Sequence, residues 1–255
     1  MSAKQGPAEA RMLSRILRWG LLLAFGLQFW SAVRPAASQT LTGQEALGQE
    51  LYTANCATCH GVGLTGTGNG PSLEGVGPAG VDFMLSTGRM PIGDPLQQPV
   101  RQEPKFTRTQ IDAVVAYISS RAPGGPPIPF VNLTEGNLPE GFRLFSGICS
   151  ACHGAGATGD SVGGGQIAPA LGAATPKQVA EAVRFGPGTM PAFGDQSLSD
   201  EELASIVRYV DFLKVSPNPG GLGIDRLGPV AEGFIAIVVG LGLLLLTIYL
   251  TGTKA

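Results

Sequence analysis

The sequence contains Cys56-Ala57-Thr58-Cys59-His60 and, 93 residues later, Cys149-Ser150-Ala151-Cys152-His153. Both stretches have the pattern C-x-x-C-H, and together they use all four cysteines and both histidines of the chain. This pattern is the attachment signature of a c-type haem, in which two thiols bond to one porphyrin and the adjacent histidine binds the iron. The sequence therefore predicts two covalently bound haem c groups, held by two matching sets of residues: Cys56, Cys59 and His60, and Cys149, Cys152 and His153.

Two other uses of paired cysteines have less support. A structural zinc site needs four nitrogen or sulfur ligands in one tetrahedron, so the two motifs would have to meet from distant parts of the chain. A redox dithiol of the thioredoxin type needs a surrounding βαβ pattern, which this sequence does not show.

Composition and charge exclude one class of partner. The chain of 255 residues has a net charge of −2, but residues 39–122 carry five Lys/Arg against seven Asp/Glu, and residues 131–215 carry five against nine. An acidic globular part argues against a nucleic acid partner. The 38 glycines and 20 prolines suit loop-rich domains built around large cofactors.

The chain has an internal repeat. Gly48, Leu51, Tyr52 and Cys56 correspond to residues exactly 93 positions later, namely Gly141, Leu144, Phe145 and Cys149. We expect helices over residues 42–52 and 107–120 of the first repeat, a helical turn or two around residues 81–86, and second-repeat helices that begin after Thr175 and Ser199. The loop after the second motif is longer than its counterpart because Gly163-Gly164-Gly165 is inserted.

The two ends of the chain are predicted to direct it to a membrane. Residues 1–38 combine arginines with an apolar run at 20–33 and a small-residue cleavage site, which indicates either a cleaved signal peptide or a retained N-terminal anchor. Residues 230–250 are long and apolar enough to span a bilayer. We expect the cell membrane as the location, the repeats on the extracytoplasmic side and the C-terminus in the cytoplasm.

The second axial ligand of each iron is predicted from the methionines. No third histidine exists, and Met90 and Met190 lie in matching G-x-M-P contexts, 30 and 37 residues after His60 and His153. We therefore predict His60 with Met90, and His153 with Met190, as the iron ligands. Met84 has no counterpart in the second repeat and is expected to fill the core. An iron with both axial positions filled favours electron transfer over catalysis.

Each repeat resembles a class I cytochrome c domain, with a Gly-x-x-x-aromatic helix before C-x-x-C-H, a later proline, a Met-Pro pair and a C-terminal helix with an aromatic residue. The resemblance implies an all-α fold in which the first and last helices cross, placing Gly48 against the helix of Tyr117 and Gly141 against that of Tyr209. It also implies that the carbonyls of Pro71 and Pro169 accept hydrogen bonds from the two histidine rings.

The whole architecture resembles the dihaem cytochrome c subunit of actinobacterial cytochrome bc complexes. The resemblance implies an electron carrier in a quinol–cytochrome c reductase, with the Rieske iron–sulfur subunit, the cytochrome b subunit and a haem–copper oxidase as partners. The chain itself would have no catalytic residues. The alternatives are the cytochrome subunit of another periplasmic dehydrogenase or oxidase, and a catalytic dihaem protein such as a peroxidase. The expected segments are a leader (1–38), a first cytochrome c domain (39–122), a Pro-rich linker (123–130), a second cytochrome c domain (131–216), a connector (217–229) and a transmembrane helix (230–250).

Overall fold

The computed structural model describes residues 42–215 and 233–252. The leader expected at 1–38 and the connector expected at 217–229 lie outside the described residues.

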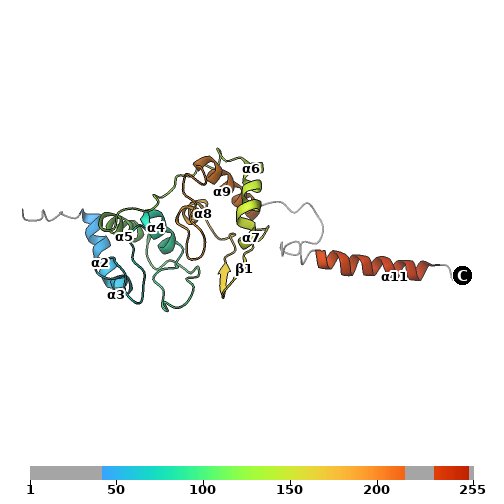
Figure 1. The fold of residues 1–255 in the computed structure, drawn as a ribbon, viewed down its shortest axis with the longest axis horizontal. Helices are drawn as coiled ribbons and strands as arrows, with labels where there is room; N and C mark the ends of the chain where they lie inside the picture. The colour runs from blue at the N-terminus through green and yellow to red at the C-terminus, as the bar shows by residue number, and fades with distance from the viewer. Residues whose placement is uncertain (1–41, 216–232, 253–255) are drawn as a thin grey trace, which may run out of the picture. The chain divides into compact units, whose positions relative to one another are not determined.

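The first repeat consists of helices joined by glycine- and proline-rich loops (Figure 1). The side chain of Thr42 accepts a hydrogen bond from the Glu45 N–H while the Glu45 carboxylate accepts one from the Thr42 N–H, and Thr107 and Gln110 form the same capping box. These two caps set the first residues of the two helices, next to the predicted positions. The helix around residues 81–86 is longer than expected. The elements are α2 (Gly43–Asn55), α3 (Ala57–His60), α4 (Gly77–Ser86) and α5 (Arg108–Arg121).

The second repeat has the same order of α-helices, with a π-helical turn and a hairpin added. The inserted glycines form the turn of an antiparallel hairpin, and Gly163, Gly164 and Gly165 all have positive φ, a conformation that favours glycine. The prediction of an all-α fold is therefore correct for the helices but missed this hairpin. The elements are α6 (Leu138–Leu144), the π-helical turn η1 (Phe145–Cys149), α7 (Ser150–His153), β1 (Asp160–Gly163), β2 (Gln166–Ala168), α8 (Pro176–Phe185) and α9 (Asp200–Val215).

The first and last helices of each repeat cross at a glycine. A Cβ atom on Gly48 would lie 2.0 Å from the Ala113 carbonyl oxygen of α5, and one on Gly141 would lie 2.0 Å from the Ser205 carbonyl oxygen of α9. Only glycine allows this backbone approach. The helix crossings implied by the cytochrome c resemblance are confirmed, with Tyr117 and Tyr209 beside the two glycines.

Aromatic residues form the centre of each core. Tyr52 packs on Tyr117 with ring centroids 5.6 Å apart, and Phe145 packs on Tyr209 at 5.5 Å. Tyr52 and Phe145 occupy matching positions and are both 1% exposed. The Tyr52 hydroxyl donates to the Gly61 carbonyl at 2.6 Å, so the core is tied to the residue that follows the first C-x-x-C-H motif.

A separate apolar helix lies near the C-terminus. It spans Gly233–Thr251, including the π-helical segment η2 (Ala236–Leu241) and α11 (Gly242–Thr251). Its length and composition suffice to cross a membrane, and its large apolar side chains are exposed. It overlaps the predicted span of 230–250.

Candidate functional site

The first C-x-x-C-H motif lies at the junction of α2 and α3. α2 ends at Asn55, and the short helix α3 carries Cys59 and His60. The His60 Nδ1 atom lies 2.8 Å from the Pro71 carbonyl oxygen, the contact that the cytochrome c resemblance implies. This carbonyl accepts the Nδ1–H of the ring and leaves Nε2 as the atom that can bind a metal.

The second motif repeats this geometry. Its histidine ends α7, and the His153 Nδ1 atom lies 2.9 Å from the Pro169 carbonyl oxygen. His153 is 9% exposed. The hairpin β1–β2 ends at Ala168, directly before Pro169, so the inserted segment leads straight to the residue that orients the histidine.

No disulfide joins any of the four cysteines, so both thiols of each motif are available to a haem. Burial, and to a smaller extent the neighbouring cysteine, raises the pKa of Cys56 to about 11, and the same causes raise the pKa of Cys149 to about 11. The described residues contain no cluster of three or more His, Cys, Asp or Glu side chains that could hold a metal ion, so the geometry gives the zinc interpretation no support.

Met90 lies in a loop that hydrogen bonds fasten to the end of α4. The Met90 N–H donates to the Met84 carbonyl at 3.0 Å, and the Gln102 N–H donates to the Thr87 carbonyl at 3.1 Å. The Met90 side chain packs against the same buried cluster as Cys56. The Met90–Pro91 peptide bond is cis. Met84 is half-buried in α4 and is not among the residues that form either core. The expectation that Met84 fills the core is therefore wrong.

Met190 is held by a different arrangement, centred on Arg184 of α8. The Arg184 guanidinium is buried and donates to the carbonyls of Phe193 at 3.0 Å and Leu198 at 2.6 Å, and to the Asp200 carboxylate at 2.5 Å. These bonds brace the loop between α8 and α9. The Met190 side chain packs against the same buried cluster as Cys149. The structure thus associates each predicted methionine with the cysteine of its own repeat.

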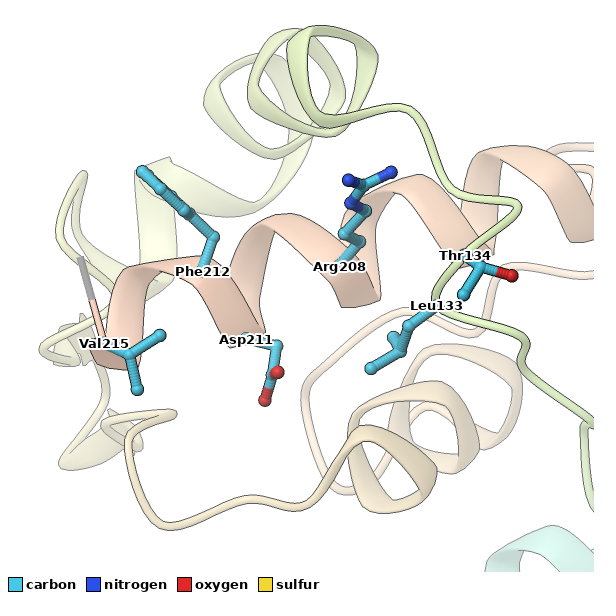
Figure 2. Close-up of a pocket in the computed structure, with 6 residues that line it drawn as sticks. All are labelled: Leu133, Thr134, Arg208, Asp211, Phe212 and Val215. Atoms are coloured by element: carbon cyan, nitrogen blue, oxygen red, sulfur yellow. The ribbon is translucent and has the colours of Figure 1, made fainter.

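The donor set of each repeat fits a covalent haem. Each offers two free thiols three residues apart, a histidine whose Nδ1 is already used, and a thioether packed on the same cluster. The hollow in Figure 2 is a separate feature on the second repeat, beside α9, and none of the predicted ligands lines it; its residues are Leu133, Thr134, Arg208, Asp211, Phe212 and Val215.

The two repeats contact each other through α4 and α8. The ring of Phe185 packs so closely on Gly80 that a Cβ there would lie 2.5 Å from it. Asp82 of α4 is fully buried, and its carboxylate accepts hydrogen bonds from Arg108 of α5 at 2.6 Å and from Lys177 of α8. Burial opposes ionisation of Asp82, but these two cations outweigh it and hold its pKa below the usual value.

A second bridge joins the loop after Met90 to the hairpin of the second repeat. The Gln98 amide donates to the Ile167 carbonyl at 2.8 Å and accepts from the Ile167 N–H at 3.0 Å. Sequence reasoning missed this interface because neither Gln98 nor Asp82 belongs to a motif. The only available signal was a short Pro-rich linker, which limits how far two joined domains can separate.

Comparison with known proteins also identifies both repeats as cytochrome c domains. The family model for cytochrome c matches residues 45–122, and the model for subunit III of cbb3-type cytochrome c oxidase matches residues 136–210. With the two repeated sites, these matches define a protein with tandem cytochrome c domains, a class that binds haem c covalently and transfers electrons.

Three relatives identify the family within that class. Each is a cytochrome bc1 complex cytochrome c subunit. The Mycobacterium leprae protein is 37% identical over 203 residues, covering 76% of this chain and 70% of the relative. The Corynebacterium efficiens protein is 32% identical, covering 96% and 92%. The Mycobacterium bovis protein is 35% identical, covering 91% and 89%. The chain belongs to the family of cytochrome bc1 complex cytochrome c subunits, which confirms the resemblance seen in the sequence.

Proposed function

We propose that this chain is the dihaem electron carrier of a membrane-bound cytochrome bc complex, taking electrons from the Rieske centre and passing them to a haem–copper oxidase. The observation that carries the proposal is the repeated set of two cysteines, a carbonyl-bound histidine and a packed methionine, in a chain whose relatives are subunits of that complex.

Each set holds one haem c. Cys56 and Cys59 bind the first haem covalently, and Cys149 and Cys152 bind the second. The iron ligands are His60 with Met90, and His153 with Met190. Haem supplies one-electron chemistry when bound. The chain's own residues fix the histidine rings through the carbonyls of Pro71 and Pro169, and each methionine packs against the buried cluster of its own repeat.

The arrangement of the chain serves this relay. The domains run from residue 39 to 122 and from 131 to 216, joined by the linker 123–130, and the contacts of α4 with α8 hold them together. The leader at 1–38 exports them, and the helix at the C-terminus anchors them to the extracytoplasmic face of the cell membrane. A fixed pair of domains replaces a diffusing carrier.

The test is affinity purification of the tagged full-length protein from membranes dissolved in mild detergent, followed by mass spectrometry and haem spectra. We expect copurification of Rieske, cytochrome b and oxidase subunits, and two covalent low-spin haems with a methionine–iron charge-transfer band. An untagged strain is the control for carry-over. A protein purified alone, or one with a high-spin haem, would support an independent carrier or a dihaem peroxidase instead.

A further inference from the structure

One arginine of the first repeat has a buried donor with no acceptor. Arg89 precedes Met90, and its guanidinium lies over the Phe83 ring, 4.9 Å from the centroid. Its Nη1 atom is buried and makes no hydrogen bond, and no carboxylate pairs with Arg89 among residues 42–215 and 233–252. A buried guanidinium N–H without an acceptor is costly, so this atom indicates a missing hydrogen-bond acceptor, and a carboxylate is the acceptor that a guanidinium binds most strongly.

A second arginine lies close to the first. The segment that follows Arg101 lies against the segment that leads to Arg89, because the Gln102 N–H donates to the Thr87 carbonyl at 3.1 Å and a Cβ on Gly88 would lie 2.3 Å from the Gln102 carbonyl oxygen. Arg101 donates to the Gln178 side chain of the second repeat at 2.7 Å, and within the described chain it has no ion pair with an acidic residue. Two neighbouring cations without a carboxylate repel each other, and an anion beside them would relieve this repulsion.

The second repeat lacks this feature. Its G-x-M-P segment has Thr189 where the first repeat has Arg89, and Thr189 is exposed. The buried arginine of the second repeat, Arg184, already has carbonyl and carboxylate partners. The missing anion is therefore a property of the first repeat alone.

We propose that Arg89, supported by Arg101, binds the propionate carboxylates of the haem attached to Cys56 and Cys59. The inference rests on the proposed function, because these carboxylates belong to that haem. Arginine suits the task because its planar donors match a carboxylate, and Arg89 adjoins a predicted iron ligand. Its positive charge favours the reduced iron, so it raises the reduction potential of the first haem and leaves that of the second unchanged.

The experiment is a spectroscopic redox titration of the detergent-solubilised full-length protein, with haem content measured in parallel. In Arg89→Gln we expect one of the two redox waves to move to lower potential, by about a tenfold change in the electron-sharing equilibrium, or about 59 mV for one electron. Arg89→Lys keeps the positive charge and should therefore keep most of the wild-type potential of that wave. The control Arg143→Gln removes the same charge from an exposed pair with Glu140 in the second repeat and should move neither wave. Arg101→Gln, at an exposed residue, should move the same wave by less and serves if Arg89→Gln fails to fold.

The outcomes separate the inference from the proposed function. Two covalent haems with both waves unmoved in Arg89→Gln and Arg101→Gln would overturn the arginine assignment and leave the proposed function intact. A wild-type wave that moves with added inorganic phosphate, but not in Arg89→Gln, would overturn it in favour of a free anion. A wild-type protein without covalent haem would overturn both.

Discussion

The two repeats share the parts that we propose hold a haem and differ in what surrounds them. Both place a glycine at the helix crossing and a proline carbonyl on the histidine. They differ at the residue before the methionine, which is Arg89 in one and Thr189 in the other, and in the hairpin that only the second contains. The shared parts are those that the proposed binding of the same group requires. The differences are positions at which two equal sites can acquire unequal potentials.

The largest expected effect tests the shared part. Valine at Gly48 or Gly141 would place its Cβ 2.0 Å from a backbone oxygen of the crossing helix, so the two helices must separate. We expect each substitution to lower the free energy of unfolding by about 3 kcal/mol or more, measured by thermal or denaturant unfolding. Gly43→Val is the control, since nothing lies within 4 Å of a Cβ at that position. If only one of the two crossings proves sensitive, the repeats are less alike than their backbones indicate.

The methionines test whether both sites have the same ligands. Met90→Ala and Met190→Ala should each abolish the methionine–iron signal of one haem and lower its potential, because methionine ligation raises the potential of a haem. Met84→Ala should change neither haem spectrum, since Met84 contributes only its backbone carbonyl to the Met90 loop. The measurement is the absorption spectrum with a redox titration. Intact signals from both haems in either ligand variant would contradict the assignment.

The sequence was sufficient for the elements that a motif or a cap defines. Thr42 with Glu45 and Thr107 with Gln110 start their helices where local hydrogen bonds dictate, and the repeat placed both methionines in matching loops. The approach of Gly48 to the helix of Tyr117 could be predicted only because the resemblance to a class I cytochrome c domain implies that these two helices cross.

The rest depended on contacts between distant residues. The glycine insertion signalled a longer loop, but the pairing of Ser161 with Ile167 that makes it a hairpin is not readable from a glycine run. Asp82 and Glu181 look like solvated charges in sequence, yet both are fully buried where α4 meets α8. Arg89 was quoted within its motif, but only the structure shows that its Nη1 atom lacks an acceptor.

The contact between the repeats contains a carboxyl group that should respond to pH. Neither carboxyl oxygen of Glu181 has a hydrogen-bond partner, and the Lys177 Nζ atom is 3.5 Å from one of them. Burial, and then the negative charge of Asp82, raise the pKa of Glu181 from 4.5 to about 8, while Lys177 partly offsets both. Between pH 4.5 and about 8, the folded protein therefore keeps a proton on Glu181 that the unfolded chain has lost.

This proton predicts a stability that falls as pH rises. Below pH 4.5 the Glu181 carboxyl is protonated in both the folded and the unfolded state, and above pH 8 it is ionised in both. The stability therefore changes with pH through this group only between these two values. There the stability falls by up to about 1.4 kcal/mol per pH unit. Glu181→Gln should flatten this part of the pH profile, measured by thermal unfolding at several pH values. Glu140→Gln, in the ion pair with Arg143 on α6 and away from the contact between the repeats, is the control. An unchanged slope in Glu181→Gln would show that the carboxyl is ionised in the folded protein.

The smallest expected effect concerns the bridge between the Met90 loop and the hairpin. Gln98→Ala removes two hydrogen bonds to Ile167, at 2.8 and 3.0 Å, each of which contributes roughly 1 kcal/mol. Gln97→Ala is a matched control, because the Gln97 side chain bonds only to nearby Asp94. We expect Gln98→Ala to speed protease cleavage within the linker 123–130 by several-fold and Gln97→Ala to leave it unchanged, with the haem spectra of both intact. The first repeat lacks the hairpin, so a loss confined to Gln98→Ala would identify the hairpin's role as fastening the second repeat to the first. Equal cleavage rates would instead leave that role to the buried charges between α4 and α8.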